Sequence, residues 1–309
     1  MRPIGVGIAS LILAMPLVAA AQVDGRLAAY TGRNAKGYLS PLVDSFRSGL
    51  NAGLFHSAEI PAQKFYVSFE VNAMATFFDN DSRWFTATTE GNFLPQQTTS
   101  APTIVGDDHA VFVDGTAGTQ YAFPGGFEIH NIYYACPQVR VGSWRGTEAL
   151  GRFVYYDTHT AELGALTFWG AGIRHSISQY FPSLHPLDVA LAGTWQDGAL
   201  QNDAGQKVLH AQIFTASLQS GMQVGVLYPY AGLSMDWFDM QLDYVFPEEW
   251  ALDPFHLDFD YNTDFQLTLG VAYHVSGFSA YGEYSLADES SVAAGLSVTF
   301  PFTNRSATP

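Results

Sequence analysis

An acidic stretch near the C-terminal third has the spacing of a metal-binding loop. Aspartates at alternate positions begin the calcium loops of EF-hands, and this stretch opens in that way. Its sixth position is a threonine where glycine is needed, and its twelfth is a leucine where a bidentate glutamate is needed, so the EF-hand interpretation fails. We expect a solvated acidic strand face or loop with no metal, a loop-bound divalent cation being the alternative, formed by His256, Asp258, Asp260 and Asp264.

Two arginines, Arg152 and Arg174, stand inside otherwise uncharged, strand-like runs. An arginine on the inner side of a wall needs carboxylate partners, because an unpaired buried charge is costly. The predicted consequence is either a charge ladder that braces the wall or a constriction that selects solutes by charge. The carboxylates expected to face inward with these arginines are Glu70, Glu148, Asp239 and Asp243.

The residues of nucleophilic catalysis form no recognisable motif. There is no G-x-S-x-G turn, and the single cysteine, Cys136, precedes Pro137 with no histidine nearby. The nine histidines and many serines could meet in space, but their spacing does not indicate it. We expect no enzyme and no cofactor, and keep a membrane-embedded lipid-modifying enzyme only as a remote third alternative.

The composition favours a membrane environment. Only 14% of the residues are charged, against about a quarter in soluble domains, whereas 15% are aromatic. The formal net charge of −16 makes nucleic acid an improbable partner. Residues 1–21 combine Arg2, an apolar run and three alanines, the layout of a secretory signal peptide.

No later segment offers the roughly 20 apolar residues of a membrane-spanning helix, and a bilayer otherwise accepts only closed barrels. Apolar residues at every second position predict the strands, for example over 65–72, 238–246, 265–273 and 292–300. Less regular runs over 82–90, 127–134, 137–145 and 222–234 indicate further strands. Since single-chain bacterial barrels have even strand numbers, we predict an all-β, transmembrane antiparallel barrel of about twelve strands (10–14). A secreted β-sandwich is the alternative, disfavoured by the small residues opposite the last apolar face.

One helix precedes the strands. Ser40 as a cap and Pro41 at the first helical position predict its start, and its end is expected near 53–56. Its packing face consists of Leu42, Phe46, Leu50 and Leu54. The predicted organisation is a signal peptide over 1–21, an N-terminal helical segment over 22–60 and a barrel over 61–309.

The helical segment is expected inside or under the periplasmic mouth of the barrel. Long polar connections are predicted over 197–207 and 247–264. Residues 94–126 form a poorly patterned insertion, either an external loop or an infolded plug.

Several stretches resemble a family of Gram-negative outer-membrane barrel proteins described only as a domain of unknown function. They are Tyr38–Leu54, Pro102–Gly106, Pro137–Gly142, Gly146–Glu148 with Arg152, and Gly170–Ile177 leading into Pro186–Val189. The resemblance implies an outer-membrane barrel with an N-terminal helix. A weaker likeness is to plugged barrels that pass hydrophobic compounds, and no binding residue is carried over from them. Residues 301–309 continue past the aromatic strand end where barrel assembly signals usually stop.

These features predict a bacterial outer-membrane protein that acts as a channel or uptake protein for small molecules, apolar ones included. The competing hypothesis is a non-conducting structural or assembly barrel that presents acidic loops to a partner. The expected partners are outer-membrane lipid, the barrel-assembly machinery and small hydrophobic ligands.

Overall fold

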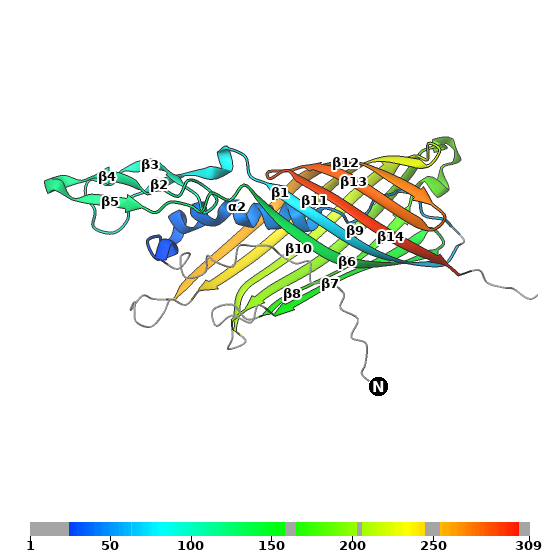
Figure 1. The fold of residues 1–309 in the computed structure, drawn as a ribbon, viewed down its shortest axis with the longest axis horizontal. Coiled ribbons are helices and arrows are strands. Elements are labelled where there is room, and N and C mark those ends of the chain that lie inside the picture. Colours follow the sequence, from blue (N-terminus) through cyan, green and yellow to red (C-terminus); the bar gives the residue numbers. More distant parts are fainter. Residues whose placement is uncertain (1–24, 63, 158–164, 203–205, 245–253, 303–309) are drawn as a thin grey trace, which may run out of the picture.

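The computed structural model describes residues 25–62, 64–157, 165–202, 206–244 and 254–302, and its centre is a closed antiparallel barrel of ten strands (Figure 1). The predicted signal peptide lies outside the described residues. The barrel closes by pairing β1 with both β14 and β6. Its strands are β1 (Tyr66–Phe77), β6 (Asn131–Trp144), β7 (Thr147–Asp157), β8 (Ala165–Ser176), β9 (Asp188–Gln201), β10 (Lys207–Gly221), β11 (Leu227–Tyr244), β12 (Phe255–Val275), β13 (Phe278–Leu286) and β14 (Ser291–Pro301).

The membrane-barrel class is therefore correct, but the strand number is ten and not about twelve. Two pairs of predicted strands are single long strands: 127–134 with 137–145 is β6, and 222–234 with 238–246 is β11. A further predicted strand, over 82–90, lies outside the barrel. The prediction divided β11 because its residues change polarity part-way along, although the backbone pairing continues with a register shift between Asp236 and Phe238.

Apolar side chains cover the outside of the barrel between the two ends. On β1, Phe69 and Val71 are 55% and 61% exposed, while Glu70 and Asn72, which alternate with them, are buried. The other strands carry the same kind of outward residue, including Val139, Phe153, Ile173, Leu191, Leu218, Leu233, Leu267, Leu269, Leu296 and Val298. A closed wall that is apolar outside and polar inside fits lipid and excludes the sandwich.

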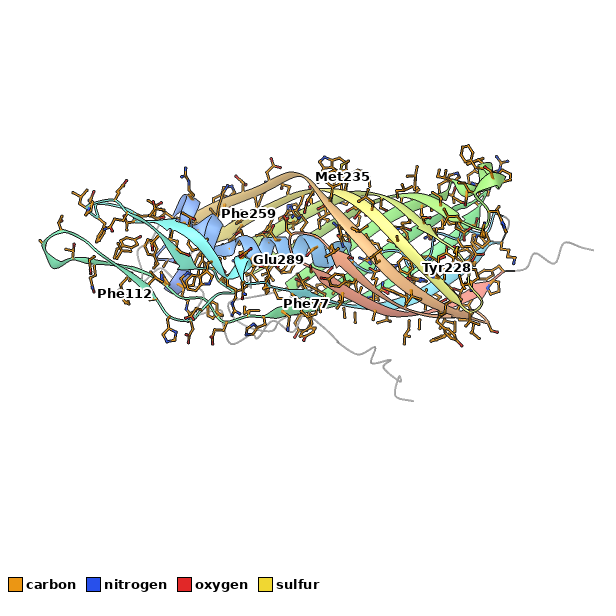
Figure 2. All side chains as sticks on the ribbon, turned by 90° about the horizontal axis from the view of Figure 1, so that it is seen from above. Phe77, Phe112, Tyr228, Met235, Phe259 and Glu289 are labelled. Carbon is orange, nitrogen blue, oxygen red and sulfur yellow. The ribbon has the colours of Figure 1, made fainter. Side chains whose placement is uncertain are left out.

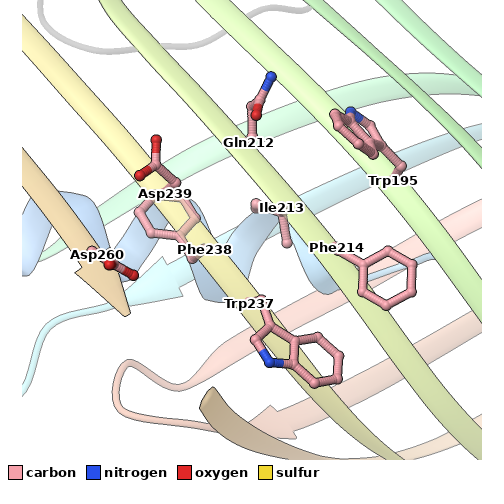
Figure 3. Close-up of a pocket in the computed structure, with 8 residues that line it drawn as sticks. All are labelled: Trp195, Gln212, Ile213, Phe214, Trp237, Phe238, Asp239 and Asp260. Atoms are coloured by element: carbon pink, nitrogen blue, oxygen red, sulfur yellow. The ribbon is translucent and has the colours of Figure 1, made fainter. Parts of the chain in front are cut away.

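An aromatic row marks where this apolar band ends on β9 to β11. Trp195, Phe214 and Trp237 are direct neighbours in the strand register, and all three point outward (Figure 3). Interfacial aromatic girdles of this kind flank the lipid-facing band of transmembrane barrels. Two residues further on, the outward side chains are polar, as Gln212 and Asp239 are, so the strands continue beyond the membrane.

The strand interiors reverse their polarity beyond this row. Phe238, Met240 and Phe259 are buried on the inside, and they belong to one apolar core with Tyr38 and Val43 of the helix. We expected the apolar face of 238–246 to contact lipid, and this is wrong. Outside the membrane water surrounds the wall, so the apolar residues turn inward as they do in a soluble protein.

The helix α2 (Gly32–Asn51) begins nine residues earlier than predicted. Pro41 lies within it and not at its start. A proline has no N–H for the carbonyl four residues earlier, here that of Gly37. The Ser40 hydroxyl donates to this carbonyl at 3.1 Å and so replaces the missing bond.

Helix α2 runs inside the barrel wall, and the chain then continues along the lumen to the far end, where β1 begins (Figure 1). Leu42, Phe46 and Leu50 pack partly buried against the main core, and Leu54 follows the helix in a smaller buried cluster. At Gly49 a Cβ atom would lie 2.7 Å from the Tyr134 ring, so glycine permits the close approach to β6.

Residues 78–130 form an arm that projects from one end of the barrel (Figure 1). Within it β2 (Trp84–Thr88) pairs with β3 (Thr98–Pro102), and β4 (Val111–Asp114) pairs with β5 (Gln120–Phe123). Short 3₁₀ turns accompany them at η2 (Asp81–Arg83) and η3 (Thr116–Gly118). The insertion at 94–126 is therefore an outward arm, and the lumen is occupied by residues N-terminal to β1.

The arm also caps the start of the helix. Glu90 accepts hydrogen bonds from the Thr31 amide and hydroxyl, both at 2.9 Å, next to the first turn of α2. A carboxylate at this place complements the unpaired N–H groups and the positive end of the helix dipole. Among the described residues, no helix is both long and apolar enough to cross a bilayer.

The opposite end of the barrel has short connections. Two residues join β6 to β7 and two join β12 to β13, while η4 (Ser178–Tyr180) and η5 (Pro182–Leu184) lie between β8 and β9. At the arm end, β9 extends to Gln201 and β12 begins at Phe255. Much of the predicted loops 197–207 and 247–264 is therefore strand.

Candidate functional site: the occupied lumen

The inner wall of the barrel holds the segment that follows α2 by hydrogen bonds to its backbone. Arg152 of β7 donates to the carbonyls of Leu50 and Ala52, at 3.0 and 3.1 Å. These carbonyls end the helix and have no partner within it. A cation at this position also complements the negative end of the helix dipole, so Arg152 fastens the end of α2 to the wall.

The next residue, Gly53, is held from the opposite side. Its amide donates to Glu283 Oε1 at 2.6 Å, and its carbonyl accepts from Asn72 Nδ2 at 3.1 Å. Tyr230 OH donates to the second oxygen of Glu283 at 2.6 Å. Gly53 has φ +65°, and a Cβ atom there would lie 2.8 Å from Tyr281 OH. Both the backbone conformation and the space at this point require glycine.

A ladder of buried charges lies around the part of the segment that follows Gly53. Glu70 of β1 pairs with Arg140 of β6, and Glu148 of β7 pairs with Arg174 of β8 at 2.6 Å. Arg140 also approaches Glu148 at 3.5 Å, which joins the two pairs. Alternating charges that satisfy one another avoid the large penalty of an isolated buried ion.

His56 and Phe55 connect this ladder to the lumen segment. The His56 Nε2 atom lies 2.8 Å from Arg140 Nη2 and 3.3 Å from Glu70 Oε1, and its ring stacks on Tyr281 at 4.8 Å. The Arg174 guanidinium lies 4.8 Å from the centroid of the Phe55 ring, a cation–π contact. The wall thus holds the lumen segment by polar contacts from several strands.

The sequence matches the family of unknown function DUF6588 over residues 1–300. The chain belongs to this DUF6588 family. No curated protein shows significant sequence similarity to it.

Solved structures that share the barrel include the toluene transporter TbuX of Ralstonia pickettii, with 8% identity, 84% of this chain and 98% of that chain covered, and a TM-score of 0.31. The β domain of the Bordetella autotransporter BrkA has 9% identity, coverage of 77% and 99%, and a TM-score of 0.34. The outer membrane protease OmpT of Escherichia coli has 8% identity, coverage of 78% and 98%, and a TM-score of 0.31. Likenesses this distant transfer no function to the DUF6588 chain.

In this DUF6588 member, four of the predicted lumen residues lie inside the wall: Glu70, Glu148, Arg152 and Arg174 are at most 3% exposed. Asp239 and Asp243 were expected inside but lie exposed on the outer face of β11. The reason is the reversal of polarity beyond the aromatic row, where carboxylates face water.

Sequence reasoning did not select Arg140 or Glu283 as lumen residues. Arg140 has the same parity on β6 as the buried Gln138, and Glu283 has the same parity on β13 as the buried Tyr281. Strand parity was therefore the signal that could have identified both residues.

The predicted acidic cluster is divided between the two sides of β12. His256, Asp258 and Asp260 are exposed on the outside, where the His256 ring lies between Asp243 at 2.5 Å and Asp258 at 3.1 Å. Asp264 instead pairs with Arg47 of the helix at 2.6 Å. The first three residues therefore lie on an exposed strand face, as expected, whereas Asp264 belongs to the helix contacts.

Arg47 is the buried centre of an acidic group at the arm end. Its guanidinium contacts Asp288 at 2.5 Å and Asp236 at 3.9 Å, in addition to Asp264. Nearby, burial and the carboxylates of Asp79, Asp44 and Asp288 raise the pKa of Glu289, in the β13–β14 turn, to about 7. The contacts of Arg47 attach the C-terminal half of the helix to β11, β12 and the β13–β14 turn.

The described residues contain fragments of other chemistry. Ser279 and the His274 Nδ1 atom are 2.7 Å apart, but within the described ranges no carboxylate bonds to the other ring nitrogen, so no triad is complete. Cys136 is buried. On the arm, ligating atoms of Asp107, Asp108 and His109 lie within 4.8 Å of one another. Asp108 and His109 are exposed, and the half-buried Asp107 bonds to the His109 ring.

Proposed function

We propose that the protein is a gated uptake barrel of the bacterial outer membrane, closed at rest by residues 32–60 and opened when this segment moves. The observation that carries the proposal is the set of hydrogen bonds from wall side chains to the segment backbone at Leu50, Ala52 and Gly53. A segment held by its backbone, without pairing into the sheet, leaves the barrel itself intact when it is displaced.

The lumen favours small polar solutes over the apolar ones expected from the aromatic content. Many of the large aromatic side chains face lipid, Phe69, Phe153 and Trp195 among them. Six of the buried wall side chains around the segment are charged, three of each sign: Arg140, Arg152, Arg174, Glu70, Glu148 and Glu283. Displacement of the segment would expose a hydrophilic constriction lined by side chains of both charges.

Short turns of outer-membrane barrels face the periplasm and longer loops face outward. On this rule the arm and the start of α2 lie outside the cell, and β1 begins at the periplasmic end. The sequence had suggested a helix at the periplasmic mouth. The proposed orientation is instead a segment that enters the lumen from the external side.

Liposome swelling with graded polar solutes tests the gate. Wild-type protein is expected to give little swelling, whereas the double variant Arg152→Ala/Glu283→Ala, which removes three bonds to the segment, is expected to swell faster. Thr268→Ala is the matched control, because the Thr268 hydroxyl bonds to the wall residue Ser285, at 2.8 Å, and to no residue in the described part of the segment. A heat-modifiable band on a denaturing gel establishes that each variant is folded.

Equal swelling of wild type and double variant would refute the gate. If the folded double variant stays impermeable, the second candidate function gains support. This is a non-conducting anchor, favoured by the projecting arm with its exposed Phe112 at one end of the molecule (Figure 2). Removal of the β4–β5 hairpin would then abolish partner binding and leave the barrel folded.

A further inference from the structure

A groove of about 400 Å³ lies at the arm end between α2, β2 and β12. Cavities of this size accommodate small ligands. Its walls carry two cations from the helix, two carboxylates from β12 and an aromatic ring from each strand. The lining residues are Arg33, Lys36, Gly37, Ser40, Phe85, Thr86, Asp258, Phe259 and Asp260.

One wall of the groove is the free edge of a strand. Over Phe255–Asp264, β12 pairs with β11 on one side, whereas β13 pairs only with Leu267–Val275. In the described part of the chain, no strand lies against the other edge of 255–264. Every second residue there presents an amide and a carbonyl without a sheet partner, which is the feature that binds extended peptides as an added strand.

The opposite wall carries Arg33 and Lys36 in the first turns of α2. Cations near a helix N-terminus are unfavourable, because they repel the positive end of the dipole, and the first turn contains no acidic residue. No ion pair links these cations to Asp258 or Asp260 within the described ranges. Separate positive and negative walls across one groove suit a ligand that carries both charges.

Between these walls the groove offers apolar surface. Phe259 is buried, and the Lys36 ammonium lies 5.9 Å from the centroid of its ring. Phe85 packs so closely on the helix that a Cβ atom at Gly37 would lie 2.5 Å from its ring. Phe85 is only half-buried, so a ligand with a short apolar side chain finds an aromatic contact there between the charged groups.

We propose that this groove binds short zwitterionic peptides, which add as a strand to the free edge of β12. The peptide carboxylate contacts Arg33 and Lys36, and its amino group contacts Asp258 and Asp260. This inference names the solute class of the proposed uptake barrel. It rests on the proposed function in one respect: the bound peptide is taken to be the solute that is captured before uptake.

Isothermal titration calorimetry on the full folded chain in detergent tests the site, with the tetrapeptide Ala-Val-Phe-Ala as the probe. Three forms are compared: the free zwitterion, a form acetylated and amidated at its ends, and a form methylated on its central amide nitrogens. Capping removes both charges, and methylation removes backbone donors. Since hydrogen bonds to charged groups are the strong ones, each change is expected to weaken binding about tenfold or more.

The variants Arg33→Gln/Lys36→Gln and Asp258→Asn/Asp260→Asn are expected to weaken binding of the free zwitterion to a similar extent. Arg145→Gln is the matched control, because Arg145 is an exposed cation in the β6–β7 turn at the other end of the barrel. Absence of heat with the zwitterion, or equal affinity for its capped or methylated form, would overturn the inference. Peptide binding without swelling in any variant would refute the gate alone, and swelling without peptide binding would refute the peptide site alone.

Discussion

At the scale of residues, charge inside the wall is tolerated because opposite charges lie next to one another. Glu148 lies between Arg140 and Arg174 and also accepts a hydrogen bond from Tyr66. Removing one member of such a network leaves its partners buried without compensation. The loss of one member is therefore expected to cost more than the loss of a single ion pair, because its remaining partners stay buried.

Glu148→Ala is expected to lower the free energy of unfolding by about 3 kcal/mol or more, because it leaves Arg140 and Arg174 without this carboxylate. Asp243→Ala is the matched control. This aspartate is exposed on the outer face of β11, so its loss is expected to cost less than about 0.5 kcal/mol. Urea titration of the protein folded in lipid vesicles measures both, and equal losses would contradict the buried ladder.

Glu289 provides a pH-dependent prediction. Burial raises the pKa of this carboxyl to about 7, above the usual value of 4.5. The folded chain then binds a proton more tightly than the unfolded chain. Its contribution to stability is fully present below pH 4.5 and is lost as the pH rises through about 7.

Unfolding of wild type and Glu289→Gln at a series of pH values checks this prediction. The variant has no titrating group at this position, so its stability is expected to fall less between pH 4.5 and 7. Parallel curves for the two proteins would mean that Glu289 titrates normally.

At the scale of elements, a proline in the middle of α2 is compensated by its neighbour. The bond from Ser40 to the Gly37 carbonyl supplies what the backbone of Pro41 cannot. The serine and proline that predicted a helix start therefore lie within a longer helix, where the serine replaces the hydrogen bond that the proline cannot make. The true start, at Gly32, depends on Glu90 of the distant arm.

A double-mutant cycle tests this compensation. Ser40→Ala alone is expected to destabilise the protein by about 1 kcal/mol. In the Pro41→Ala background the new amide can bond to Gly37, so the same substitution is expected to cost almost nothing. Additive effects in urea titrations would show that the two residues act independently.

At the scale of the whole molecule, the chain crosses the lumen once, from the arm end to the opposite end, before it forms the barrel. The chain passes from the arm end, along the helix and the lumen, to the short-turn end where β1 starts (Figure 1). Tyr228 marks this far end in Figure 2, opposite the arm. With the proposed orientation, the start of the described chain lies at the cell surface.

Cysteine labelling on intact cells measures this orientation. Ala29→Cys, exposed next to the start of α2, is expected to react with a membrane-impermeant maleimide. Arg145→Cys, exposed in the β6–β7 turn, is expected to react only after the membrane is opened. Cys136 is buried and serves as the internal background. The reverse pattern would place the arm in the periplasm.

The alternation of residue types was sufficient to predict a transmembrane barrel and to place Glu70, Arg152 and Arg174 on its inner side. Within the bilayer this inference is secure, because lipid accepts only apolar side chains and leaves the polar face to the lumen. The apolar face of the helix could be predicted for the same reason, as Leu42, Phe46 and Leu50 repeat with helical spacing.

Only the tertiary structure decided which face of a strand is inner beyond the membrane and what occupies the lumen. A period of two defines two faces, but it does not say which one meets water, so Asp239 and Asp243 were placed on the wrong side. The contacts that fill the lumen join residues far apart in the chain, such as Gly53 with Glu283. No local pattern encodes that meeting, because it depends on closure of the barrel around the segment.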